Sequence, residues 1–209
     1  MRIAAVTTLA AGLAMLLVTF GGRAVAVEEA KYTLVQQYQE FEIRQYAPYI
    51  VAETLVEGDF DQVGNLGFRR LAGYIFGDNR RRQSVPMTSP VAQQAESRKI
   101  AMTAPVNQEP VGGSWRITFT MPAGYTLETL PEPLAPEVQL RERQGQLMAA
   151  LRYSGTWSRE RYEENKARLE TMIAEQGLQP VGPAVFARYN PPFMPWFLRR
   201  NEVLIPIRP

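Results

Sequence analysis

The chain contains no histidine and no cysteine, which excludes several common kinds of functional site. It cannot form a Ser-His-Asp or Cys-His catalytic group, a thiolate or imidazole zinc site, or a histidine-ligated haem. A haem iron bound here would take its axial ligand from methionine, from tyrosine or from outside the chain. Disulfides are excluded as well, so the fold needs a core large enough to be stable by itself.

An excess of charge of one sign is also missing. The chain has 23 basic and 21 acidic residues, and residues 1–26 hold two of the basic residues and no acidic residue. The remaining residues therefore carry 21 charges of each sign. Nucleic-acid binders need a basic surface that releases counterions from phosphates, so we expect no nucleic-acid partner.

The N-terminal residues have the pattern of a signal peptide, residues 1–26. Arg2 precedes an apolar stretch from Ile3 to Phe20, and Ala24-Val25-Ala26 is a small-residue cleavage site. We expect cleavage before Val27, export to the periplasm or beyond, and no stable membrane insertion of the cleaved protein. A retained membrane anchor is the alternative, because the apolar stretch is about long enough to cross a bilayer.

One short segment occurs twice, as Pro86–Val91 and as Ala101–Val106. Each copy contains Met-Thr followed by a proline, which cannot donate to a sheet ladder and holds the preceding residue in extended geometry. Met87 and Met102 therefore either fill gaps in the core or line a ligand pocket.

Hydrophobic periodicity indicates an α+β fold in which one order of elements occurs twice. The first half has a hairpin at residues 41–57, a helix beginning at Asp59 or Asp61, extended segments, and a strand at residues 115–121. The second half has strands at residues 138–140 and 147–153, a helix after Ser158, and strands at residues 185–189 and 202–207. Each half thus follows the order strand, strand, helix, strand, strand. We expect one curved or closed sheet with both helices outside it.

The first helix carries a buried stripe and several glycines. The stripe consists of Val63, Gly67, Leu71, Tyr74 and Ile75. Asn65, Phe68, Arg69 and Ala72 lie off this stripe, so an exposed Phe68 beside an arginine is either a porphyrin contact or a lone apolar surface residue. The glycines at 64, 67 and 73 weaken the helix, which indicates close approach of a flat ligand or of the sheet.

Five separated motifs resemble the SOUL haem-binding family in the same order along the chain. They are Gly73–Asn79, Ile100–Val106, Trp115–Pro122, Arg188–Pro192 and Arg199–Glu202. The resemblance implies that residues 27–209 form one SOUL haem-binding domain, a distorted β-barrel of two pseudo-symmetric halves with two flanking helices. The halves span about residues 32–122 and 137–207, and the fold is similar to effector-binding domains of the gyrase-inhibitor type.

Animal members of the SOUL family bind haem and other tetrapyrroles in an exposed apolar cleft between the first helix and a late loop. The resemblance therefore implies that this chain binds haem or a related tetrapyrrole without histidine ligation, as a carrier, buffer or sensor. It implies no metal site built by the protein itself. The candidate ligand-binding residues lie on the first helix, in the two Met-Thr segments and in the late loop: Asn65, Phe68, Arg69, Ala72, Met87, Met102, Phe193, Met194 and Trp196.

The late loop, residues 191–198, also points to binding by its composition. It carries five large apolar side chains among three prolines, and such a patch is costly to leave in water. The loop therefore marks a binding surface or a lid, or it packs over one end of the barrel. We expect Arg199, Arg200 and Glu202 to anchor it through ion pairs.

Two other functions stay open from the sequence. A small-molecule hydrolase on the same fold would use glutamate with tyrosine, and Glu53 and Glu57 have a spacing that can place both on one side of a strand. We expect these two glutamates to be solvated, however, and we expect no catalytic residues and no enzyme activity. A protein-interaction module that uses the late loop is the other alternative, with an unknown protein partner.

Overall fold

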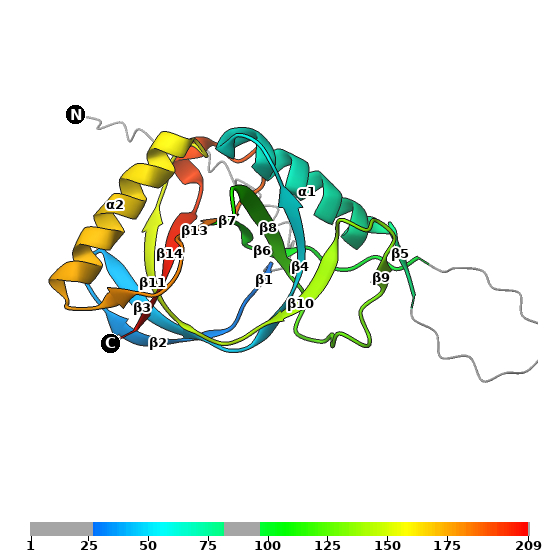
Figure 1. Cartoon of the computed structure of the whole chain (residues 1–209), viewed down its shortest axis with the longest axis horizontal. Helices are drawn as coiled ribbons and strands as arrows, with labels where there is room; N and C mark the ends of the chain where they lie inside the picture. The colour runs from blue at the N-terminus through cyan, green and yellow to red at the C-terminus, as the bar shows by residue number, and fades with distance from the viewer. Residues whose placement is uncertain (1–26, 82–96, 209) are drawn as a thin grey trace, which may run out of the picture.

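The computed structural model describes residues 27–81 and 97–208. The predicted signal peptide and Met87 with its Met-Thr segment lie outside the described residues. Figure 1 shows the elements in chain order. They are β1 (Glu28–Glu29), β2 (Tyr32–Gln37), β3 (Phe41–Tyr46), β4 (Tyr49–Val56), α1 (Phe60–Phe76), β5 (Asn79–Arg80), β6 (Thr103–Ala104), β7 (Val106–Val111), β8 (Ser114–Thr120), β9 (Glu132–Pro133), β10 (Gln139–Arg143), β11 (Leu147–Tyr153), α2 (Arg159–Glu175), β12 (Gln179–Pro180), β13 (Val185–Arg188), η1 (Trp196–Leu198) and β14 (Asn201–Arg208).

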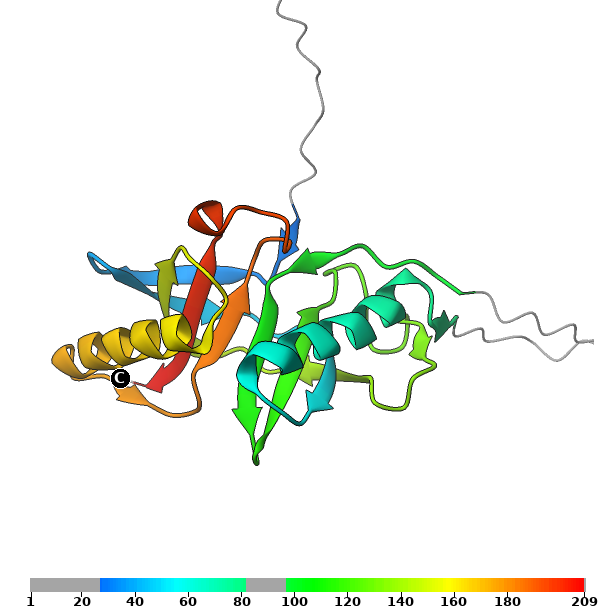
Figure 2. The same ribbon diagram turned by 90° about the horizontal axis from the view of Figure 1, so that it is seen from above.

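One large antiparallel sheet curls into a half-barrel. Its strand order is β10-β4-β8-β7-β13-β14-β11-β3-β2, and the short β12 pairs with β14. Both helices lie on the outer face of the sheet, as Figures 1 and 2 show. The predicted α+β class with two flanking helices is confirmed. The sheet stays open in the described part of the chain, where β10 and β2 are its edge strands.

Successive side chains of a strand differ in character because the two faces of the sheet meet different surroundings. On β3, Phe41 and Ile43 pack beneath α2, while Arg44 and Tyr46 face the concave side of the sheet. A strand places successive side chains on opposite faces, so one sequence lines both the apolar outer core and the interior of the half-barrel.

The helices begin and end largely as their sequences predict. The N-cap of α1 is Asp59, the predicted stripe is buried, and Gly77 ends the helix with a φ of 138°, which favours glycine. The N-cap of α2 is Ser158, whose hydroxyl accepts a hydrogen bond from the backbone N–H of Arg161. No helix in the described ranges is long and apolar enough to cross a bilayer.

The two helices point their N-terminal ends toward each other above the middle of the sheet (Figure 2). Phe60, the first residue of α1, stacks on Tyr162 of α2 with ring centroids 5.1 Å apart. It also packs against Phe186 of β13 at 5.6 Å and edge-on against Trp115 of β8 at 5.2 Å. This aromatic cluster fixes the start of α1 beside β13.

The helix glycines serve close packing inside the protein. A Cβ on Gly67 would overlap the Ile117 side chain of β8, and a Cβ on Gly64 would lie 2.5 Å from Nη2 of Arg188. A Cβ on Gly73 would lie 2.5 Å from Oδ2 of Asp78. Of the two explanations that the sequence left open for Gly67, the structure supports close approach of the sheet.

Candidate functional site

An apolar cleft of about 270 Å³ lies between α1 and the segment that follows β13, and we call it the α1–loop cleft. One wall comes from Gly64, Asn65 and Phe68 of α1, and the opposite wall comes from residues 188–192. Val27, residues 102–104, Val106 and Trp157 complete the lining, which is the most apolar among the described hollows.

Three of the predicted ligand-binding residues meet in this cleft. Asn65, Phe68 and Met102 all line it, although Met102 is 34 residues away from Phe68 in the sequence. Phe68 was expected to be exposed but is half-buried. Its ring packs edge-on against Phe119, with the ring centroids 5.4 Å apart. Its remaining surface faces the cleft.

The other predicted residues lie elsewhere. Arg69 is exposed and does not line the cleft. Ala72 is buried, whereas its position off the core stripe predicted a ligand-facing surface. The segment after residue 97 returns along the end of α1, where the Ile100 N–H donates to the Ile75 carbonyl.

The late loop approaches the cleft through its prolines. Pro191 and Pro192 line the cleft, while Phe193 and Trp196 project into solvent with exposed fractions of 85% and 56%. Met194 is half-buried and does not line the cleft either. The loop therefore presents an exposed apolar surface beside the cleft mouth.

Two arginines anchor the late loop as expected, but within the described ranges only Arg200 does so through ion pairs. The Arg199 guanidinium donates to the backbone carbonyls of Met194 and Pro192 at 2.8 and 2.7 Å. Arg200 instead pairs with Glu202 and with Glu29.

Arg188 is the charged residue of the cleft, and sequence reasoning missed it. Burial lowers the pKa of Arg188 to about 10, so the guanidinium stays protonated at neutral pH. Nη2 donates to Oε1 of Gln108 at 3.4 Å, and the guanidinium lies 5.4 Å from the Trp157 ring centroid. The sequence signals were its place at the end of an apolar strand and at the start of the Arg188–Pro192 motif.

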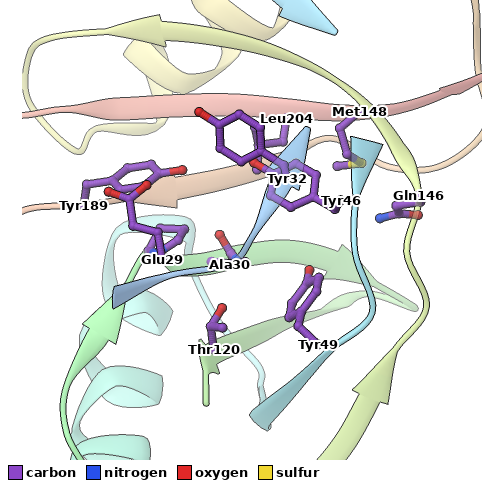
Figure 3. Close-up of a pocket in the computed structure, with 12 residues that line it drawn as sticks. Glu29, Ala30, Tyr32, Tyr46, Tyr49, Thr120, Gln146, Met148, Tyr189 and Leu204 are labelled. Atoms are coloured by element: carbon purple, nitrogen blue, oxygen red, sulfur yellow. The ribbon is translucent and has the colours of Figure 1, made fainter. Parts of the chain in front are cut away.

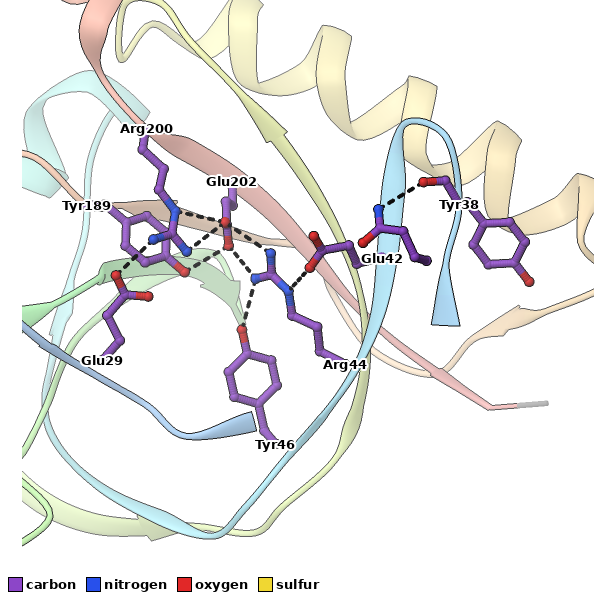
Figure 4. A network of polar contacts seen from close by, with 9 residues as sticks. Glu29, Tyr38, Glu42, Arg44, Tyr46, Tyr189, Arg200 and Glu202 are labelled. Carbon is purple, nitrogen blue, oxygen red and sulfur yellow. Dashed lines mark hydrogen bonds and ion pairs between the residues drawn. The ribbon is translucent and has the colours of Figure 1, made fainter. Parts of the chain in front are cut away.

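The concave side of the sheet holds a second buried site, a polar network around Glu202 (Figure 4). Arg44 donates to both carboxylate oxygens of Glu202 at 2.7 and 3.2 Å. Arg200 donates at 3.0 Å, and the Tyr189 hydroxyl donates at 2.8 Å. Burial raises the pKa of Glu202, but Arg44, then Arg200 and Tyr189, outweigh that effect and hold the pKa below its usual value.

The space beside this network is small. The cavity enclosed by Tyr32, Tyr46, Tyr49 and Thr120 holds about 20 Å³, room for roughly one water molecule. Figure 3 shows these side chains around it. Burial raises the pKa of Tyr46 to about 12 despite the nearby Arg44. The interior of the half-barrel is thus occupied by the protein's own side chains.

The expectation that Glu53 is solvated is wrong. Glu53 is buried on β4, and its carboxylate pairs with Arg141 at 2.7 Å, Arg143 at 3.1 Å and Arg116 at 3.5 Å. Neighbouring strands bring these arginines to it across the sheet, a long-range pairing that the strand's own sequence does not show. Glu57, just past β4, is exposed. Glu202 and Glu53 are therefore both paired with arginines.

A third hollow of about 370 Å³ lies between residues 28–31, 47–50 and 120–128. Its lining includes Glu28, Glu29 and Glu142 with one lysine, Lys31. A hollow lined by several acidic residues suits a flat apolar ligand less well than the α1–loop cleft does.

Solved structures with the same fold come from proteins of very different sequence. A hydrolase from Listeria innocua superposes with a TM-score of 0.58 at 10% identity, covering 83% of this chain and 94% of that chain. An uncharacterized conserved protein from Listeria innocua reaches 0.59 at 12% identity, covering 81% and 92%. The C-terminal domain of EcmrR reaches 0.56 at 9% identity, covering 85% and 98%. At such identities the likeness concerns the fold alone.

Sequence comparison is more specific. The chain is 27% identical to mouse heme-binding protein 2 over 175 residues, covering 78% of this chain and 79% of the relative. It is 24% identical to heme-binding protein 1 of Xenopus tropicalis over 189 residues, covering 88% and 92%. The family model described as SOUL heme-binding protein matches residues 27–206. This chain belongs to the SOUL heme-binding protein family.

Proposed function

We propose that the protein binds haem or a related tetrapyrrole in the α1–loop cleft, as a carrier, buffer or sensor rather than as an enzyme. The observation that carries the proposal is the cleft itself, an apolar hollow in which Asn65, Phe68 and Met102 meet. Relatives named heme-binding protein 1 and 2 support the same ligand class.

The dimensions of the cleft fit partial burial of a porphyrin. Its volume of about 270 Å³ is near the lower end of small-molecule pockets, so a flat ligand would keep one edge in solvent. Burial of apolar surface contributes about 25 cal/mol per Å² before the costs of association. We therefore expect affinity on the order of micromolar.

The residues present fit a haem that is held without histidine. Phe68 and Pro192 offer apolar contact surface, and the Met102 thioether is a soft donor that lines the same cleft. When bound, haem supplies a redox-active iron that binds small ligands. The chain's own residues bind the macrocycle and shield one part of it from water.

A binding role agrees with the state of the buried carboxylates. A general acid or base needs a carboxyl that can exchange a proton near the working pH, whereas Arg44 and Arg200 keep Glu202 ionised. A protein-interaction role for the late loop is the second candidate, and the exposure of Phe193 and Trp196 favours it.

A hemin titration followed by absorption tests the proposal. The wild type should shift the Soret band with saturation, and the ferric spectrum should be largely high-spin because Met102 contributes weak ligation at most. Asn65→Trp places a large side chain in the cleft from an exposed helix position and should weaken binding by about tenfold or more. Gln62→Trp is the matched control, since Gln62 is exposed on α1 and does not line the cleft.

The two variants separate the outcomes. Equal affinity in wild type, Asn65→Trp and Gln62→Trp would place haem outside the cleft. Absence of any saturable Soret shift in the wild type would overturn tetrapyrrole binding.

A further inference from the structure

Several arginines that are buried or half-buried in this protein pair with a carboxylate. Arg44 pairs with Glu202, Arg200 pairs with Glu202 and Glu29, and Arg116 pairs with Glu109 at 2.5 Å. Arg188 makes no ion pair with the described residues. A cation that is taken out of water without an anion is costly, so an unpaired one needs a reason.

The contacts that Arg188 does make leave most of its charge uncompensated. The guanidinium makes one hydrogen bond to the described residues, from Nη2 to Oε1 of Gln108 at 3.4 Å. This is a long bond to a neutral acceptor. Nε is buried and has no hydrogen-bond partner among the residues that the structure describes. The rings of Trp157 and Phe186 lie 5.4 and 5.6 Å from the guanidinium carbon, near the outer limit for a cation–π contact.

The helix leaves room for this guanidinium. Both terminal nitrogens of Arg188 lie where a side chain at position 64 would begin, 2.5 and 2.7 Å from an ideal Cβ. Gly64 therefore lets Arg188 lie against the α1 backbone, in the wall of the cleft. The result is a single fixed cation in a largely apolar hollow whose other described lining residues are uncharged.

We propose that Arg188 is the anion-binding group of the α1–loop cleft, and that the cleft selects apolar ligands that carry a carboxylate. The inference rests on the proposed function, because it assigns a propionate of the tetrapyrrole to Arg188. A guanidinium matches a carboxylate through two parallel N–H···O bonds. In low-dielectric surroundings that pair is stronger than at the surface.

Metal-free protoporphyrin IX and its dimethyl ester test the proposal, because they differ in the carboxylates and offer no iron to an axial ligand. Fluorescence titration should show that the wild type prefers the diacid by about tenfold or more. Arg188→Met keeps the length of the side chain without its charge and should bring the ratio close to one. Arg188→Lys should keep part of the preference. Arg152→Met is the control, since Arg152 is exposed and does not line the cleft.

Thermal unfolding without ligand checks the folded state. Arg188→Met should melt no lower than the wild type, because the substitution removes an unpaired buried charge. A lower melting temperature together with an unchanged diacid preference would assign Arg188 to structure and overturn the inference.

The remaining outcomes separate the inference from the proposed function. Equal binding of diacid and diester by the wild type would overturn the role of Arg188 and leave tetrapyrrole binding in place. If neither porphyrin binds but dodecanoate binds the wild type and not Arg188→Met, the carboxylate site stands and the tetrapyrrole assignment fails. If none of the three compounds binds, both fail.

Discussion

Glu202 illustrates how a single buried residue depends on distant partners. Its carboxylate is fully buried at the centre of the sheet, and Arg44, 158 residues away in the sequence, donates two hydrogen bonds to it. A buried ion pair gives little net stability relative to apolar residues, but removal of one partner leaves a buried charge without compensation.

We therefore expect Glu202→Gln to lower the free energy of unfolding by about 3 to 5 kcal/mol, as measured by urea denaturation. Glu164→Gln is the control, because its ion pair with Arg161 is about half-exposed and solvent screening limits the loss to less than about 1 kcal/mol. Equal losses in the two variants would contradict the description of the interior network.

The same carboxylate makes stability depend on pH. The pKa of Glu202 in the folded protein lies below the ordinary 4.5. In acid, the folded state therefore binds less proton at this carboxylate than the unfolded state does. The contribution of Glu202 is complete above pH 4.5 and is lost as the pH falls through the lower folded pKa. The wild type should lose stability more steeply in this acid range than Glu202→Gln does.

Charged residues in buried places were the hardest to predict from the sequence. Arg188 and Glu202 lie in motifs that signalled the family, but their burial depends on strands far away in the chain. Asn65 and Phe68 were easier, because helical periodicity alone puts them off the buried stripe of α1.

At the scale of elements, the late loop combines a stiff backbone with exposed apolar side chains. Prolines limit its backbone freedom, and Arg199 ties two of its carbonyls together. Pro195 precedes the short helix η1, whose Phe197 and Leu198 are 58% and 61% exposed. The loop is thus pre-organised without being buried.

The double substitution Phe193→Ala and Trp196→Ala should weaken hemin binding by about tenfold or more, because a porphyrin that extends beyond the cleft meets this loop. The melting temperature should shift little, since both side chains are largely exposed. Titration and thermal unfolding of the same preparation check both statements. A large melting shift with unchanged affinity would assign the loop to packing.

Helices and strands with a strong hydrophobic periodicity were predictable from the sequence. Strands that are held only by hydrogen bonds to a neighbouring strand were not. The buried stripe of α1, the helix after Ser158 and the strand at residues 115–121 were all predicted from local sequence. Strand β2 is exposed along its whole length and shows no apolar alternation, and β1 pairs with β6 across about 75 residues. Such strands form because a neighbouring edge offers hydrogen bonds, which a local pattern does not reveal.

At the scale of the whole molecule, the cleft joins segments that lie far apart in the sequence. Three residues of α1 line it together with residues 102–104, Val106, Trp157 and residues 188–192. The concave interior, by contrast, is filled by the Glu202 network. Periodicity predicted the order of helices and strands, but only the family resemblance predicted a cleft between the first helix and a late loop.

The location of bound haem tests this account most directly, and paramagnetic broadening of assigned backbone amide NMR signals measures it. On addition of ferric haem, the signals of Asn65, Phe68 and Met102 should broaden first and most. The signals of Tyr32, Tyr49 and Thr120 around the interior cavity should persist. Broadening centred on that interior cavity, or confined to residues 193–198, would contradict the assignment of the α1–loop cleft as the binding site.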